Sequence, residues 1–244
     1  ADKFNSLQMG MVAAERIFEI LETHSNIEDK GTLKPSQING NICLEKLGFS
    51  YNQGERIIND ISLEIKSGET IALVGATGAG KSTIINLISR FYEFDSGDIT
   101  IDGISIRKYD LKSLRNKVSV VLQDVFLFAD SLFNNITLFD SQISKDKVIE
   151  AAKNIGVHDF IESLPNGYEY NVKERGVMLS TGQRQLIAFL RAYISEPSIL
   201  VLDEATSSVD SYSEEIIQTA IDTLTKGKTS IIIAHRLATV KNAD

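Results

Sequence analysis

One short segment of the chain carries residues whose types and spacing fit phosphate chemistry. Residues 75–82 read Gly-Ala-Thr-Gly-Ala-Gly-Lys-Ser, which matches the pattern G-x-x-x-x-G-K-S. Glycines let backbone amides turn inward around phosphate oxygens, the lysine supplies a cation for the outer phosphates, and the serine hydroxyl can ligate Mg²⁺. The pattern therefore predicts a nucleotide site with Mg²⁺. The residues assigned to the nucleotide here are Gly75, Ala76, Thr77, Gly78, Ala79, Gly80, Lys81, Ser82 and Thr83.

An acidic pair, Asp203-Glu204, directly follows the apolar run 199–202. Two acids at the end of a buried strand are costly unless they meet a cation or a catalytic partner. In a protein with a phosphate loop, we expect Asp203 to approach Mg²⁺ through Ser82 or a water. Glu204 is then free to polarise the water that attacks the γ-phosphate. The alternative is an exposed loop acid followed by a helix cap.

Two further polar side chains follow predicted strands: Gln123 comes after residues 118–122 and His235 after residues 230–234. Ligands of open α/β sheets bind outside the carboxyl ends of the strands. We therefore expect His235 to contact the γ-phosphate and Gln123 to contact Mg²⁺ or the attacking water. The predicted catalytic set is Lys81, Gln123, Glu204 and His235, and the predicted metal ligands are Ser82, Gln123 and Asp203.

The elements around these residues must place them at one edge of a sheet. Residues 71–74 are a continuous apolar run, typical of a strand buried on both faces, and a helical apolar spacing follows the glycine loop over 84–91. Strand, glycine loop and helix in this order begin a parallel α/β unit, which favours a phosphate loop over a chance glycine-rich turn. The same buried-strand pattern recurs at 118–122, 199–202 and 230–233.

Other segments carry different patterns. Residues 61–66 and 99–102 alternate between apolar and polar, which predicts half-buried, antiparallel strands. Residues 124–196 look mainly helical, with Ser144 as an N-cap and Gly156 as a stop for one helix. The predicted fold class is α/β: a P-loop NTPase core with a parallel sheet, an antiparallel β flank and an inserted α-helical subdomain.

The opening residues form a separate prediction. Residues 1–24 space their apolar side chains as in an amphipathic helix, and the polar stretch 25–40 indicates a linker. The helix either packs on its own domain or connects to a preceding domain.

Composition narrows the classes of function. The chain has 244 residues, a formal net charge of −8 and a pI near 5.0. This balance argues against a nucleic-acid partner, because nucleic-acid binders usually present a basic face. The one cysteine excludes an internal disulfide and fits a reducing compartment. The longest apolar runs are too short to span a bilayer.

Residues 179–183, Leu-Ser-Thr-Gly-Gln, followed by Arg-Gln, resemble the signature sequence of ABC ATPases. The other elements of that family follow in order: an A-loop aromatic at Tyr51, the phosphate loop, Gln123, the acidic strand end, a D-loop at 207–210 and His235. The resemblance covers residue 42 to the end. It implies that Tyr51 stacks on the adenine of ATP. It also implies that Ser180, Gly182 and Gln183 of one chain complete the nucleotide site of another, in a head-to-tail dimer.

Two features depart from the family pattern. Thr181 stands where the family usually has glycine, and we expect it to be tolerated. The chain stops at residue 244, where relatives normally continue, so we expect the C-terminal edge to be truncated.

Three segments resemble ABC exporters in particular: Glu174-Arg175-Gly176, residues 127–136, and residues 10–21. Glu174 and Arg175 could instead form a surface ion pair, which contributes little. The exporter resemblance implies an ATPase coupled to a transmembrane domain at the cytoplasmic face of the cell membrane. The alternatives are an ABC ATPase acting on DNA or ribosomes, and a dimerising module with degenerate catalysis. A homodimer and a heterodimer both stay open, and so does the transported compound.

The predicted organisation has five parts. They are a connector helix from a transmembrane domain (1–24), a linker (25–40), the ATP-binding core with its antiparallel flank (41–123), the helical subdomain with the signature (124–196) and the remainder of the core (197–244).

Overall fold

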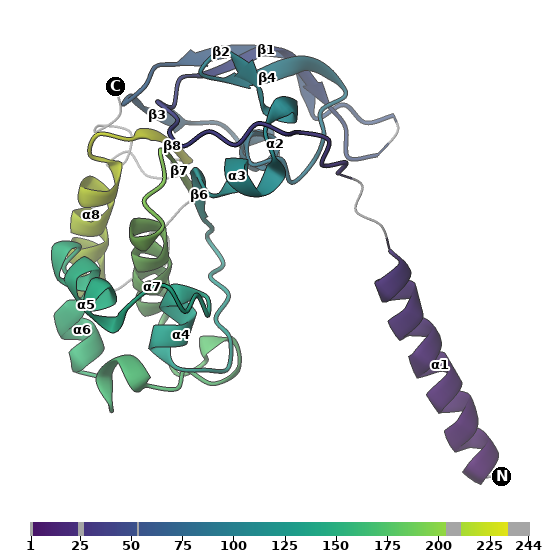
Figure 1. Cartoon of the computed structure of the whole chain (residues 1–244), viewed down its shortest axis with the longest axis vertical. Coiled ribbons are helices and arrows are strands. Elements are labelled where there is room, and N and C mark those ends of the chain that lie inside the picture. The colour runs from purple at the N-terminus through teal and green to yellow at the C-terminus, as the bar shows by residue number, and fades with distance from the viewer. Residues whose placement is uncertain (1, 24–26, 53, 204–210, 234–244) are drawn as a thin grey trace.

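The computed structural model describes residues 2–23, 27–52, 54–203 and 211–233. Two sheets and a group of helices form the body of the molecule, and one helix extends away from it (Figure 1). Glu204, the predicted D-loop at 207–210 and His235 lie outside the described residues.

The antiparallel sheet has the strand order β2-β1-β4-β5. Its strands are β1 (Ile42–Phe49), β2 (Ile58–Ile65), β4 (Ser96–Ile101) and β5 (Ile104–Ser105). Alternate side chains of β2 and β4 point into the core, and both strands pair antiparallel to β1. The prediction of half-buried antiparallel strands over 61–66 and 99–102 is confirmed, because one face of this sheet covers apolar side chains and the other meets water.

The parallel sheet has the order β3-β8-β7-β6. The central strands are β7 (Ile199–Asp203) and β8 (Thr229–Ile233), and the outer ones are β3 (Thr70–Leu73) and β6 (Val118–Val121). All five residues of β8 and the first four of β7 are buried, as the apolar runs predicted. Parallel strands covered on both faces have this composition.

The prediction of a strand buried on both faces is wrong for residues 71–74. The residues of β3 are only half-buried, and the next residue, Val74, is 66% exposed. Among the described strands, β3 pairs with β8 alone and so lies at the edge of the sheet. An edge position exposes side chains that an apolar run alone would place in the interior.

The helix α2 (Lys81–Ile88) starts at the phosphate loop and buries five of its eight residues against both sheets' shared core. The predicted helical spacing to residue 91 ends three residues early, and Phe91 is 44% exposed. Two short helices, η1 (Ile106–Lys108) and α3 (Leu111–Arg115), follow β5 of the antiparallel sheet in the sequence and precede β6 of the parallel sheet.

Helices fill the chain between β6 and β7, on the opposite side of the parallel sheet from the antiparallel sheet (Figure 1). They are α4 (Leu132–Thr137), α5 (Lys145–Asn154), α6 (His158–Glu162), η2 (Gly167–Glu169), η3 (Glu174–Gly176) and α7 (Thr181–Ile194), followed after β7 by α8 (Ser211–Thr225). Ser144 caps α5 by accepting a hydrogen bond from the Lys147 amide, and Gly156 follows the helix with φ +76°. Both predicted signals are confirmed, and so is the predicted fold class.

The first helix, α1 (Asp2–Glu22), is a helix as predicted. Its side chains from Lys3 onward are exposed, apart from the half-buried Ala14. Apolar residues such as Phe4 (70%) and Phe18 (61%) therefore face outward. None of the helices in the described part of the chain is both long and apolar enough to span a membrane.

The described part of the predicted linker, residues 27–40, is bound to the core. Leu33 forms a parallel bridge with Tyr109, and the Arg90 guanidinium donates to the Glu28 carbonyl at 3.1 Å. The Asp102 carboxylate accepts hydrogen bonds from the amides of residues 39–41 at 2.7, 3.1 and 2.9 Å. The polar composition of residues 25–40 predicted a linker, and in the structure hydrogen bonds to Arg90 and Asp102 of the core satisfy part of the backbone of its described residues.

Candidate nucleotide-binding site

The phosphate loop has the backbone that its glycines predicted. Gly78 and Gly80 both adopt φ +85°, a left-handed conformation in which a glycine carries no steric penalty. Gly80 is the N-cap of α2, and a Cβ added there would come within 2.7 Å of the Ile58 side chain. The loop therefore delivers the chain directly into a helix N-terminus, whose free amides and dipole favour an anion.

Lys81 folds its side chain back over this loop. Its ammonium donates to the carbonyl oxygens of Gly75 at 2.8 Å and Ala76 at 3.0 Å. A turn in the loop is closed by the Ala79 amide on the Ala76 carbonyl at 3.1 Å. The ammonium is thus held at the mouth of the loop, where it can meet phosphate oxygens.

Ser82 and Asp203 lie together although 121 residues separate them in the sequence. The Ser82 hydroxyl donates to the Asp203 carboxylate at 3.4 Å, which is a long hydrogen bond. It joins the first turn of α2 to the carboxyl end of β7, as the sequence predicted for these two residues. Hydroxyl and carboxylate oxygens are ligands that Mg²⁺ prefers. No cluster of three or more His, Cys, Asp or Glu that could hold a metal occurs in the described part of the chain.

Tyr51 lies against the same helix. Its hydroxyl is 3.1 Å from the Thr83 hydroxyl, and the Asn86 side-chain amide donates to it at 3.5 Å. The ring makes edge contacts with Phe49 and Tyr92, with ring centroids 4.8 and 4.9 Å apart. Sequence reasoning found Tyr51 and Thr83 but missed Tyr92. Phe91 and Tyr92 follow α2 in the sequence, and this aromatic pair was the signal that could have pointed to Tyr92. Which residues the pair contacts depends on how the chain turns beyond the helix.

Gln123 is exposed in the loop after β6, and no hydrogen bond joins it to another described residue. Its predicted roles toward Mg²⁺ and water therefore stay predictions, as do those of Glu204 and His235. Glu204 follows β7 in the sequence and His235 follows β8, and both lie outside the described residues.

The signature segment forms the start of α7. Ser180 caps the helix: its hydroxyl accepts from the Gln183 amide at 3.2 Å, and the Gln183 side chain accepts from the Ser180 amide at 2.9 Å. Thr181 is exposed and accepts from Arg184 at 3.1 Å. This capping box fixes the direction in which the helix N-terminus points.

The structure does not join the signature to the phosphate loop of the same chain. Figure 1 shows α2 beside the sheets and α7 among the helices on the other side, and the hydrogen bonds between Ser180 and Gln183 lie within the start of α7.

Glu174 and Arg175 lie in η3, where Lys173, Arg175 and Gly176 all have positive φ. Both side chains are exposed, and neither takes part in a salt bridge with another described residue. The alternative of a surface ion pair is therefore not seen in the described structure.

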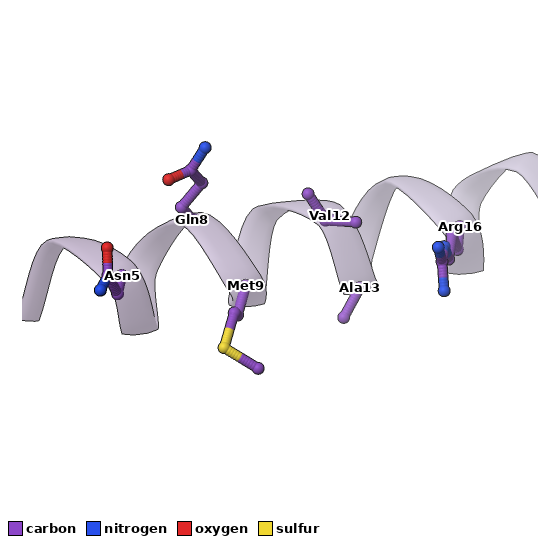
Figure 2. A pocket seen from close by; sticks show the side chains of 6 residues that line it. All are labelled: Asn5, Gln8, Met9, Val12, Ala13 and Arg16. Carbon is purple, nitrogen blue, oxygen red and sulfur yellow. The ribbon is translucent and has the colours of Figure 1, made fainter. Parts of the chain in front are cut away.

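Pockets occur on α1 and also between elements of the body of the molecule. Figure 2 shows one on α1 alone, and since its walls belong to a single exposed helix it has no connection with the phosphate loop. Its lining residues are Asn5, Gln8, Met9, Val12, Ala13 and Arg16. A groove of about 910 Å³ lies instead between β6, the segment after it, and α4 and α7.

A glycine loop between a parallel strand and a helix, with a serine from that helix beside an acid at the end of another strand of the same sheet, defines an α/β nucleotide-binding domain of the phosphate-loop class. Comparison with known proteins narrows the class. The family model described as "ABC transporter" matches residues 58–207, more than half of the chain. The chain belongs to the ABC transporter family and is an ABC ATPase domain, so the resemblance drawn from its motifs is confirmed.

Related proteins share most of this chain. An ABC transporter ATP-binding protein of Bacillus subtilis, YknV, is 46% identical over 99% of the chain and 40% of its own length. The putative multidrug export ATP-binding/permease protein YgaD of the same organism is 44% identical over 98% of the chain and 42% of its own length. A bacterial Atm1-family ABC exporter with ATP bound has a similar structure, with a TM-score of 0.86 and 35% identity over 99% of this chain and 42% of that one. This chain thus spans about two-fifths of the length of these relatives.

Proposed function

We propose that this chain powers an exporter by binding and hydrolysing ATP with Mg²⁺ at the phosphate loop. The observation that carries the proposal is the pairing of Ser82, on the phosphate-loop helix, with Asp203, at the end of β7. The names of relatives that contain "multidrug export" and the exporter structure with ATP bound support the exporter assignment.

Ser82 and Asp203 would hold Mg²⁺ between them and the nucleotide, with Gln123 as a third candidate ligand. When bound, Mg²⁺ would neutralise the negative charge of the phosphate oxygens. The described residues alone offer too few ligands for a metal site, which fits an ion held mainly through the phosphates.

The remaining roles follow from the chemistry of each side chain. Lys81 moves from the carbonyls of its own loop to the outer phosphates and stabilises the charge that develops on them. Glu204 orients the attacking water, and His235 contacts the γ-phosphate. Tyr51 stacks on the adenine, and residues 75–83 bind the phosphates.

Two copies are proposed to complete each other's sites. Ser180 and Thr181 are exposed at the N-terminus of the 14-residue helix α7, which is a favourable end for an anion. Ser180, Gly182 and Gln183 of one copy would face the phosphates held by the loop of its partner. A two-fold arrangement then forms two equal ATP sites, whether the partner is a second copy or a related chain.

A transmembrane domain is the second proposed partner, at the cytoplasmic face of the membrane, with α1 as the connector. The groove of about 910 Å³, which is lined by Leu122 and Asp124 on either side of Gln123 in the sequence, would receive it. Phe126, Phe128 and Phe139 form a chain of edge contacts near this groove, with centroids 5.2 and 5.7 Å apart, and all three are about half exposed. An exposed apolar cluster of this kind marks a contact surface.

The experiment is analytical ultracentrifugation of the Glu204→Gln variant with and without ATP and Mg²⁺. We expect a monomer that becomes a dimer only with nucleotide, because hydrolysis no longer reopens the pair. The control is the same variant with Lys81→Ala, which should remain a monomer.

Two results would contradict the proposal. A Glu204→Gln variant that binds ATP but stays monomeric would exclude the dimer for this chain. Turnover of ATP at the wild-type rate in that variant would remove Glu204 from its role. Binding of nucleic acid in moderate salt would instead favour an ABC ATPase acting on DNA or ribosomes.

A further inference from the structure

The contacts around Tyr51 assign a function to two residues that bind no base themselves. We propose that Thr83 and Tyr92 are positioning residues that hold the Tyr51 ring at the height of the nucleobase, so that α2 joins the base subsite to the phosphate subsite. The inference rests on the proposed function, in which Tyr51 stacks on the base.

The hydrogen bond to Thr83 links the ring to the phosphate loop. Thr83 is 6% exposed in the first turn of α2, two residues after Lys81, and its hydroxyl lies 3.1 Å from the Tyr51 hydroxyl. A β-branched side chain in a helix has restricted rotamers, so the position of this hydroxyl is closely set by the helix backbone. Any shift of the first turn of α2 therefore moves the anchor of the ring.

The aromatic contacts fix the ring in the other directions. Phe49, at the end of β1, and Tyr92, after α2, each meet the Tyr51 ring edge to face, at interplanar angles of 85° and 87°. Phe49 and Tyr92 also touch each other, with centroids 5.8 Å apart. Edge-to-face contacts between aromatic rings are directional. The ring is thus held by three elements and still leaves 44% of Tyr51 exposed for a ligand.

A ring held before the nucleotide arrives loses little freedom on binding, and this preorganisation increases affinity. The proposal therefore concerns only the part of the affinity that the base provides. That part is measured by a ratio, the dissociation constant for tripolyphosphate divided by the dissociation constant for ATP, each measured with Mg²⁺. Weaker binding of the base lowers this ratio. Tripolyphosphate tests the phosphate loop alone.

The test is calorimetric titration of the chain and its variants Tyr51→Phe, Thr83→Val and the double variant. Each single variant removes one hydroxyl of the bond and keeps the shape of the side chain. We expect each to lower the ratio by about two- to tenfold, the range for one hydrogen bond. We expect the double variant to lower the ratio no further than Tyr51→Phe alone, because that variant already breaks the contact with Thr83 as well as the longer one with Asn86.

Tyr92 is tested by a matched pair of variants. Tyr92→Phe keeps the ring and should leave the ratio as in the wild type, whereas Tyr92→Leu removes the edge contact and should lower it. Equal unfolding temperatures of the variants would show that the change is not a loss of folding.

The outcomes separate this inference from the function on which it rests. If Tyr51→Ala retains the full ratio, Tyr51 does not contact the base and the proposed stacking role fails. If Tyr51→Ala lowers the ratio but Tyr51→Phe does not, the positioning role alone is overturned. If Thr83→Val weakens ATP and tripolyphosphate by the same factor, Thr83 contributes only to phosphate binding, as proposed for residues 75–83, and does not position the Tyr51 ring.

Discussion

Arg191 is a half-buried cation in α7 that holds three parts of the chain together. Its guanidinium donates to the carbonyl of Asn135 at 2.6 Å, to the side-chain oxygen of Asn135 at 3.1 Å and to the carbonyl of Phe126 at 2.9 Å. Burial lowers the pKa of Arg191 to about 10, so the group remains charged at neutral pH. No salt bridge joins it to a carboxylate of the described residues.

The structure allows a magnitude for Arg191→Met. Three hydrogen bonds from a charged donor contribute about 4–9 kcal/mol in total. The same burial that lowers the pKa opposes the charged form by about 3 kcal/mol. Methionine restores apolar contact but leaves Asn135, which is fully buried, without these donors. We therefore expect the variant to lose about 3 kcal/mol of unfolding free energy.

The assay is urea unfolding followed by far-ultraviolet circular dichroism, since the chain has no tryptophan to report by fluorescence. The matched control is Lys153→Met in α5, an exposed cation in the same helical region, for which we expect a change below about 0.5 kcal/mol. A loss below about 1 kcal/mol for Arg191→Met would refute the reasoning, because it would mean that water replaces the guanidinium at its acceptors.

Three further predictions concern Asp102, Tyr168 and Thr181. Asp102→Ala should lower the unfolding free energy by about 1–2 kcal/mol in urea, because three amides of residues 39–41 lose their acceptor; an unchanged midpoint would contradict this. Burial raises the pKa of Tyr168 from 10.0 to about 12, so its stabilising effect is complete below pH 10 and is lost as pH rises toward 12. Tyr168→Phe should remove about 2 kcal/mol of this alkaline loss in urea titrations, and equal pH profiles would exclude the effect. Thr181→Gly should keep ATP turnover within about twofold, since Thr181 is exposed and its hydroxyl accepts a hydrogen bond from Arg184 of the same helix; a many-fold higher rate would show that the Cβ obstructs the site.

The parts that the sequence determined alone are those whose chemistry is local. A glycine loop needs only consecutive residues to reach φ +85° at Gly78 and Gly80, and the predicted Ser144 cap needs a partner only three residues away. The continuous apolar runs likewise predicted β7 and β8, which lie in the middle of their sheet. Together with the family resemblance, these patterns were sufficient for the fold class and for ATP.

The order of strands was decided only by the tertiary structure. The apolar run of β3 is no less apolar than that of β8, yet among the described strands β3 lies at the edge of the sheet and is only half-buried. Periodicity reports which faces of an element are apolar, but it does not report how many neighbours the element has. For the same reason, the docking of residues 27–40 through Arg90 and Asp102 could not be predicted from their polar composition.

The neighbours of each functional side chain were also settled by the fold. Ser82 meets Asp203 across 121 residues, and Tyr51 meets Thr83 and Tyr92 from three different elements. Contacts of this kind depend on where the sheets and α2 bring distant backbone together, and no local pattern encodes that distance. The sequence therefore named the groups that can do the chemistry, and the packing of α2 between the sheets decided which of them act together.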